Sequence, residues 1–389
     1  MPLPRSPRFR LSAAALLAAA CTAGLLYSPA RATDRPAGRD RPLREQLAEL
    51  TRTPGGPPGA IAVLTRGPHT EMVRAGVADT GSGRPPTIGD HMRIASTAKA
   101  FSGAVALGLV DRGKLGLDDT LGRVLPRLPR AWHRVTLRQL LNHTSGLPDY
   151  TTDPEFIALV TEDPRRRFDS RRLLDFVADR PPGFRPGTRY AYSNSDNIAV
   201  ALMAEAVTGR RYEELLDRLV YRPLDLRDTS LPQGYELPEP YLHGYEADPP
   251  RPPEDVSEVL SASGVWASGG IVSTPGDMTA FVRGYAGDRL LSAPTRRRQR
   301  AWVDGASEPA GPGANKAGLG LFRYTTRCGT VVGHTGNFPG YTQLVAATPD
   351  GERSLTFSVT TQINKTTDPE LLERLRAVQE DFVCALLRR

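Results

Sequence analysis

The segments with strand character lie at both ends of this chain, and the segments with helical character lie between them. Alternating, β-branched stretches occur at 59–67 and 71–79, and they return at 331–334, 341–348 and 354–360. Strands from both ends can share one sheet if the chain between them forms a separate layer. The sequence therefore predicts an α+β fold in which the N- and C-terminal segments build one antiparallel sheet flanked by helices.

The predicted helices fill the middle of the chain and also close its C-terminus. They share apolar residues at helical spacing, and several end at glycine. Their expected ranges are 40–52, 97–112, 133–142, 196–208, 212–221 and 368–387. We expect a helical subdomain of about 96–261 inserted into an α/β part of about 40–95 and 262–389. A ligand site between the two parts is the natural arrangement.

The first 32 residues are predicted to be a signal peptide. A basic start precedes an apolar run that is short for a membrane span, and Ala30-Arg31-Ala32 offers a small-x-small cleavage site. Two alternatives remain open, an uncleaved N-terminal anchor and a lipidated Cys21. The expected product is a secreted, monomeric protein without stable membrane association.

The net charge gives no indication of a nucleic-acid partner. The formal charge of +7 falls to +3 once the four arginines of the first 32 residues are removed. The remaining charges are mixed along the sequence and form no long basic stretch, unlike those of a nucleic-acid-binding protein.

Cysteine and histidine usage points to a disulfide and away from metal binding. Cys328 and Cys384 remain after signal cleavage, and a lone pair in an oxidising compartment is more often bridged than free. The expected packing of the last helix on the sheet would let them meet, although two buried thiols remain an alternative. The six histidines are scattered, so neither a metal site nor another cofactor is expected.

Ser96 and Lys99 form the first candidate catalytic pair. Residues three apart share one face of a helix, so a helix beginning here places the hydroxyl beside the amine. A serine becomes a useful nucleophile when a neighbouring base takes its proton, and a lysine whose pKa is depressed can do so. An ordinary polar helix start is the alternative for this motif taken alone.

Tyr192 and Asn194 form the second motif, on a loop before a predicted helix. The tyrosine can act as a general base if cationic neighbours lower its pKa. The asparagine can bond a substrate carbonyl and bridge to Lys99. A simpler interpretation is that Tyr192 covers the start of the helix.

His334, Thr335 and Gly336 form the third motif, predicted at the end of a strand. A small residue at Gly336 would let a substrate backbone lie along the strand edge. The next backbone N–H, at Asn337, could pair with that of Ser96 as an oxyanion hole. Taken alone, this motif is better explained as a strand end followed by a turn.

Together, the order and separation of the three motifs resemble those of the penicillin-recognising serine hydrolases. The resemblance is to the class C β-lactamase and D-alanyl-D-alanine carboxypeptidase group, and it runs from about residue 40 to the C-terminus. Further matching segments are 140–147, Pro186-Gly187, 221–224 and 268–274.

The resemblance implies that Ser96 is acylated, that Lys99 and Tyr192 exchange protons, and that Asn194 positions the substrate. It assigns 334–336 to the strand beside the substrate carboxylate. His334 departs from the lysine usual in the lactamases and is similar to the secreted D-alanyl-D-alanine carboxypeptidase/transpeptidase type. An unperturbed imidazole is mostly neutral at pH 7, so we expect His334 to give the site less positive charge than the lysine of the lactamases would.

Two further residues have more than one interpretation. Arg323 could bind a C-terminal carboxylate of a D-alanyl-D-alanine peptide, although arginine is common throughout this chain. His143 could be catalytic, but we expect it to cap a helix and to pack the helical region.

The leading functional hypothesis is a serine D-alanyl-D-alanine carboxypeptidase acting on cell-wall peptides, which would also bind β-lactams. A β-lactamase or an esterase with the same nucleophile is the alternative within enzymes, because one scaffold can serve several substrates. A non-hydrolytic binding protein is a further alternative, disfavoured because Ser96, Lys99, Tyr192 and Asn194 are all present.

Overall fold

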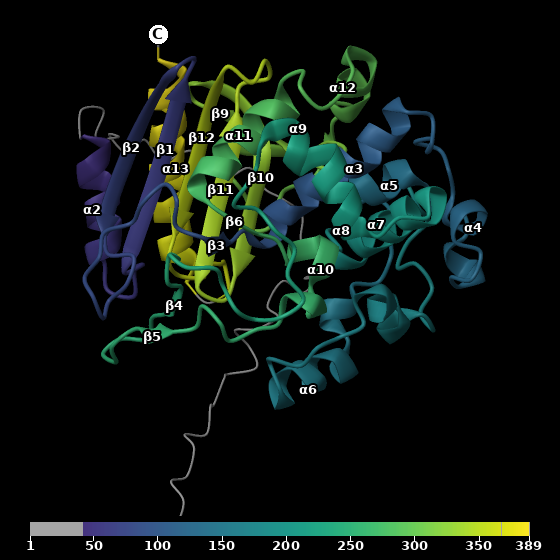
Figure 1. Ribbon diagram of the computed structural model, residues 1–389, viewed down its shortest axis with the longest axis horizontal. Coiled ribbons are helices and arrows are strands. Elements are labelled where there is room, and N and C mark those ends of the chain that lie inside the picture. The colour runs from purple at the N-terminus through teal and green to yellow at the C-terminus, as the bar shows by residue number, and fades with distance from the viewer. Residues whose placement is uncertain (1–41, 367, 389) are drawn as a thin grey trace, which may run out of the picture.

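The computed structural model of the protein describes residues 42–366 and 368–388. Within them, eight strands form one sheet in the order β2-β1-β12-β11-β10-β9-β8-β7, and every neighbouring pair is antiparallel. Figure 1 labels β2, β1, β12, β11 and β10 of this sheet. The strands are β1 (Gly59–Arg66), β2 (His69–Gly76), β7 (Val303–Asp304), β8 (Ala314–Ala317), β9 (Phe322–Thr326), β10 (Gly329–Phe338), β11 (Tyr341–Ala347) and β12 (Arg353–Val359).

The two ends of the chain meet inside this sheet. β1 lies between its hairpin partner β2 and the C-terminal strand β12, with Ala60 opposite Val359 and Arg66 opposite Arg353. The predicted α+β architecture, with one antiparallel sheet built from both ends, is therefore confirmed.

Alternation along the strands divides the apolar core between the two faces of the sheet. In β1, Ala62 and Leu64 face α2 (Leu43–Arg52) and α13 (Pro369–Leu387), whereas Ile61 and Val63 face the opposite core. α11 (Pro275–Ala286) packs on that second face, and the other helices extend from it to the right of the sheet in Figure 1.

The region away from the sheet is built around α3 and α7, which pack against each other in the core. Its remaining elements are mostly short. The helices are α3 (Ala98–Asp111), α4 (Leu121–Val124), α5 (Leu137–Leu141), α6 (Pro154–Glu162), α7 (Asn194–Thr208), α8 (Tyr212–Leu216), α9 (Arg222–Leu224), α10 (Trp266–Gly269) and α12 (Ala293–Gln299). Two short strand pairs accompany them: β3 (Met92–Arg93) pairs with β6 (Val272–Ser273), and β4 (Tyr245–Glu246) pairs with β5 (Glu254–Asp255). The 3₁₀ turns are Ala95–Thr97, Arg130–Trp132, Tyr150–Thr152, Ser170–Val177 and Ala262–Gly264, and a π-helical turn spans Asp217–Tyr221.

Several predicted boundaries were wrong for identifiable reasons. The helix expected over 133–142 begins only at Leu137, because the Thr136 side chain and Gln139 form a capping box there. The strand expected over 331–334 continues to Phe338, so the His334 motif lies inside a strand rather than at its end. The helix expected to stop before Pro223 continues through α9, in which proline occupies the first turn, where it is tolerated.

The predicted signal segment and Cys21 lie outside the described residues, as do the first two residues of the helix expected over 40–52. None of the helices within 42–366 and 368–388 is long and apolar enough to cross a membrane. The same residues contain no cluster of three metal-ligating side chains.

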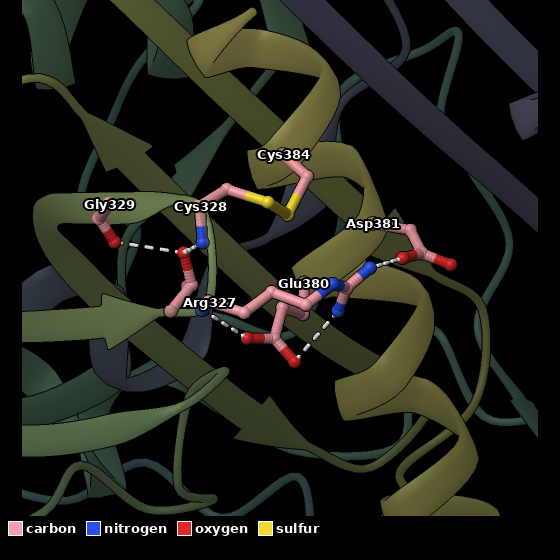
Figure 2. The surroundings of a disulfide bond; sticks show 7 residues. Arg327, Cys328, Gly329, Glu380, Asp381 and Cys384 are labelled. Atoms are coloured by element: carbon pink, nitrogen blue, oxygen red, sulfur yellow. Dashed lines mark hydrogen bonds and ion pairs between the residues drawn. A yellow bond between two sulfur atoms is a disulfide. The ribbon is translucent and has the colours of Figure 1, made fainter. Parts of the chain in front are cut away.

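Cys328 and Cys384 form a disulfide that ties the β9–β10 turn to α13 (Figure 2). Their Cα atoms are 5.1 Å apart. Beside the disulfide, the Arg327 backbone N–H donates to Glu380 at 2.8 Å, and its guanidinium pairs with both Glu380 and Asp381. The last helix is thus held to this turn by a covalent bond and by charge.

Candidate active site

Ser96 lies on a tight turn between β3 and α3. Ala95, just before it, adopts a left-handed backbone with φ of 51°, a conformation that costs a non-glycine residue free energy and is found at functional sites. Ser96 is partly exposed, whereas Ala95 and Thr97 are buried. The turn therefore presents one hydroxyl at the start of a buried helix.

Gly336 of β10 packs directly against this turn. A Cβ at position 336 would lie 2.5 Å from the Ile94 carbonyl oxygen and 3.0 Å from the Thr97 hydroxyl. The glycine is required for close approach of the strand to the Ser96 turn. This reason differs from the predicted one, which was room for a substrate backbone.

The Lys99 amine lies at the centre of the site. Its Nζ is 3.0 Å from the Ser96 hydroxyl, 2.7 Å from Asn194 Oδ1 and 2.8 Å from the Ser268 carbonyl oxygen. The side chain is 1% exposed, and burial lowers the pKa of Lys99 to about 7, while Asp149 acts in the opposite direction.

An ammonium would donate to all three neighbours, whereas a neutral amine, which a pKa of about 7 allows, would donate to two of them. Asn194 Oδ1 and the Ser268 carbonyl oxygen can only accept, so they take the two N–H bonds of an uncharged –NH₂. The nitrogen lone pair is then left for the third neighbour, the Ser96 hydroxyl. The arrangement can therefore withdraw the serine proton.

Asp149 and Thr151, to which no sequence motif pointed, fix the orientation of the Asn194 side chain. Asn194 Nδ2 donates to Asp149 at 2.9 Å and to Thr151 at 3.2 Å, and its backbone N–H donates to Asp149 at 3.0 Å. Both amide hydrogens are thus used within the protein. The expected bridge to Lys99 is present, whereas a bond from this amide to a substrate would require one of these partners to be released.

Tyr192 faces Lys99 from the other side. The Lys99 Nζ lies 4.9 Å from the centre of the Tyr192 ring, and the buried hydroxyl has no hydrogen-bond partner among the described residues. Burial raises the pKa of Tyr192 well above its ordinary value, with the nearby Ser96 hydroxyl opposing this. The condition expected for a tyrosine base, a pKa lowered by cations, is not met, and Tyr192 is a neutral phenol.

β10 provides an open strand edge beside Ser96. β9 pairs with β10 only as far as Gly333, so within the sheet His334 to Phe338 have a partner on the β11 side alone. The Asn337 side chain bonds to Ile363 and Thr342, which leaves its backbone as the group available to a substrate. The arrangement is compatible with the predicted oxyanion hole.

The side chains of His334 and Thr335, the other two residues of the third motif, are buried and already have polar partners within the protein. Burial lowers the pKa of His334 to about 3, so the imidazole is neutral, and its Nδ1 lies 2.6 Å from the Thr335 carbonyl oxygen. The Thr335 hydroxyl donates to the Pro309 carbonyl oxygen at 2.6 Å. Neither group presents a positive charge to a substrate.

His143, which was expected to cap a helix and to pack the helical region, packs its ring behind Tyr192. The two ring centres are 4.5 Å apart, and His143 Nδ1 lies 2.8 Å from Asp196 Oδ2. Burial and then Lys99 lower the pKa of His143 to about 3, and burial raises that of Asp196 well above its usual range. His143 is therefore a neutral support for the tyrosine ring.

Arg323 lies on β9 with its guanidinium over the Trp302 ring, 5.5 Å from the ring centre. This is not the placement expected for a residue that binds a substrate carboxylate. The functional neighbours that sequence reasoning missed are Asp149, the Ser268 carbonyl and Glu308. Ser268 is the first residue of the matching segment 268–274, and Asp149 lies two residues beyond the segment 140–147. No sequence motif pointed to Glu308.

A serine at a helix start, a buried lysine within 3.0 Å of it and an open strand edge, set on this sheet, define a β-lactamase/transpeptidase-like serine hydrolase. The chain belongs to the beta-lactamase family, whose family model, described as "Beta-lactamase", matches residues 43–380.

Curated relatives include several hydrolases of the same family. Penicillin-binding protein 4* of Bacillus subtilis (strain 168) is 26% identical over 72% of this chain and 63% of its own length. D-aminopeptidase of Brucella anthropi is 30% identical over 72% of this chain and 52% of its own length. D-alanyl-D-alanine-carboxypeptidase/endopeptidase AmpH of Escherichia coli (strain K12) is 27% identical over 76% of this chain and 77% of its own length. The chain thus spans about half to two thirds of the first two relatives.

Solved structures agree on the fold. A D-stereospecific amidohydrolase from Streptomyces sp. is 29% identical, with a TM-score of 0.74 over 86% of this chain and 97% of that one. The D-amino acid amidase from Ochrobactrum anthropi SV3 complexed with L-phenylalanine amide is 24% identical, with a TM-score of 0.77 over 88% and 98%.

Proposed function

We propose that this protein is a serine-type D-alanyl-D-alanine carboxypeptidase that acts on cell-wall peptides through an acyl-enzyme on Ser96. The observation that carries the serine chemistry is the 3.0 Å contact between Ser96 and a buried Lys99 whose pKa is lowered to about 7. The carboxypeptidase activity is supported by the penicillin-binding and carboxypeptidase relatives.

In the first half of the reaction, Ser96 Oγ attacks the scissile carbonyl carbon as its proton passes to Lys99 Nζ. The backbone N–H groups of Ser96 and Asn337 hold the oxyanion. The C–N bond then breaks, and the Tyr192 hydroxyl gives a proton to the leaving amine as it receives one from Lys99. Water hydrolyses the ester in the second half and restores Ser96.

The neutral phenol of Tyr192 is suited to this proposal as a donor rather than as a base. Its raised pKa keeps the proton in place until the leaving nitrogen can accept it. Asn194 and the Ser268 carbonyl hold the Lys99 amine with its lone pair toward Ser96. A cell-wall substrate further requires export, which is the function proposed for the first 32 residues.

The proposal is tested by intact-mass measurement after penicillin treatment, followed over time, alongside release of D-alanine from an N-acylated D-alanyl-D-alanine peptide. We expect D-alanine release and a long-lived adduct on Ser96, both absent in Ser96→Ala. Rapid penicillin turnover would indicate a β-lactamase instead. Absence of labelling together with strong ester cleavage would indicate an esterase.

A further inference from the structure

The one-turn helix α10 carries a carbonyl group that holds the Lys99 amine. The Ser268 carbonyl oxygen accepts from Lys99 Nζ at 2.8 Å. The next residue, Gly269, packs against the Ser96 turn, where an added Cβ would lie 3.8 Å from the Ala95 carbonyl carbon. α10 also packs on α3 and α7. The position of this short helix therefore sets the position of one acceptor of the amine.

α10 begins with a tryptophan in an unfavourable backbone conformation. Trp266 has a φ of 32°, in the left-handed region that costs a non-glycine residue free energy. Its carbonyl oxygen accepts from the Gly270 backbone N–H at 2.7 Å, so the same residue closes the helical turn that contains Ser268. A single turn gains few internal hydrogen bonds. Contacts outside the turn must therefore keep Trp266 in this conformation.

The Trp266 indole makes those contacts, and its partners lie on α8 and beside it. The indole is fully buried, and its Nε1 donates to Glu213 Oε1 at 3.1 Å. Tyr212 packs against it edge to face, with ring centres 5.3 Å apart. Arg171 binds the second Glu213 oxygen at 3.1 Å, and its guanidinium lies over the indole, 5.1 Å from the ring centre. A buried N–H without an acceptor is costly, so Glu213 fixes the rotation of the indole.

The link from Trp266 to Lys99 is mechanical. The indole has no exposed surface, so it cannot contact a substrate. The pKa of Lys99 is lowered by burial, and the acidic residues that oppose this are Asp149, Glu308 and Asp196. Within the described part of the chain, Glu213 is not one of them, so its charge is not the link either. What joins Trp266 to the amine is the helical turn that ends at the Ser268 carbonyl.

From this chain of contacts, we infer that Trp266, anchored by Glu213, is a positioning residue that aims the Ser268 carbonyl at the Lys99 amine. The inference rests on the proposed acyl-enzyme chemistry at Ser96 and adds two residues to which no sequence motif pointed. A fixed acceptor for one N–H restricts rotation of the amine and directs its lone pair toward Ser96. Loss of the bond between indole and carboxylate lets α10 shift, and the carbonyl then no longer restrains the amine.

The test compares p-nitrophenyl acetate hydrolysis by Trp266→Phe and by Trp132→Phe. Trp132 is the matched control, because its indole is also fully buried and also loses one N–H bond, to the Arg180 carbonyl oxygen. Both variants should be less stable to denaturant than the wild type. Only Trp266→Phe should lower kcat/KM, by about 10- to 100-fold, as expected when a catalytic group is misplaced by about 1 Å. Its rising limb of kcat/KM should also move to lower pH, because the lost acceptor had stabilised the Lys99 ammonium.

A second pair of variants tests the inference without altering the tryptophan. Glu213→Leu leaves the indole without its acceptor and should repeat both effects. Glu214→Leu, which removes the neighbouring exposed carboxylate paired with Arg210, should repeat neither. The double variant of Trp266→Phe and Glu213→Leu should be no worse than the more impaired single variant, because both substitutions remove the same bond.

Two results would overturn the inference while the proposed function stands. One is an unshifted pH profile in Trp266→Phe with a loss of activity no larger than that of Trp132→Phe. The other is a loss in the double variant equal to the product of the two single losses. Hydrolysis by Ser96→Ala at the wild-type rate would instead overturn the proposed function, and the inference with it.

Discussion

At the scale of single residues, burial of Lys99 decides how the candidate site responds to pH. The histidines beside it, His143 and His334, have pKa values lowered to about 3, and the pKa of Tyr192 is raised, so none of these titrates near neutrality. Lys99 and Glu308, each with a pKa of about 7, are the groups of the site that titrate near neutrality.

We therefore expect kcat/KM for an uncharged ester to rise with pH through about 7 and then to level off. Below this pH Lys99 is an ammonium without a lone pair, and above it the amine can take the Ser96 proton. The measurement is a pH–rate profile in the wild type and in Glu308→Gln. Loss of the rising limb in the variant would assign it to Glu308 and contradict the role of Lys99.

Asp149→Asn should affect both the position of Asn194 and the charge of Lys99. The substituted amide turns one accepting oxygen into a donor facing the Asn194 donors, so we expect a loss of about 10- to 100-fold in kcat. Because Asp149 raises the pKa of Lys99, the rising limb of kcat/KM should also move to lower pH. An unchanged profile with reduced activity would show that Asp149 is structural only.

At the scale of elements, contact between β10 and the turn before α3 sets the distance between the nucleophile and the strand edge. Gly336→Ala should destabilise the protein by about 1–3 kcal/mol, because the added methyl meets the Ile94 carbonyl and the Thr97 hydroxyl. Denaturant unfolding and penicillin labelling measure the two effects. Gly89→Ala, where a Cβ meets nothing within 4 Å, is the control and should be neutral.

The elements also show what the sequence could and could not predict. Long periodic segments, such as the α3, α7 and α13 helices and β11 and β12, were found because each carries its own apolar pattern. β7 and β8 were missed, since two- and four-residue strands carry no such pattern; β7 depends on pairing with β8, and β8 on pairing with β9.

The candidate site likewise contains residues whose proximity could be predicted from the sequence and residues whose proximity could not. Ser96 and Lys99 share one helical turn, so their spacing alone predicts proximity. Asp149 meets Asn194 across 45 residues of sequence, and Glu308 reaches the site on a loop. Tertiary packing creates such contacts, so no local spacing in the sequence predicts them.

At the scale of the whole molecule, the disulfide and its neighbouring ion pairs fix the last helix to the sheet. Reduction should lower the thermal midpoint, and chain-entropy reasoning for a separation of 56 residues limits the loss to about 4 kcal/mol. Thermal unfolding with and without reductant measures it, with Cys328→Ser as the reductant-independent comparison. Two free thiols in the denatured, unreduced protein would contradict the bridge.

The position of β1 also governs when this protein can become active. β1 needs β12 as a neighbour, and the Ser96 turn needs β10, so neither contact can form before the C-terminal strands have been synthesised. Such long-range pairing must wait for the whole chain. A nascent polypeptide therefore carries Ser96 in an unassembled state through almost all of translation.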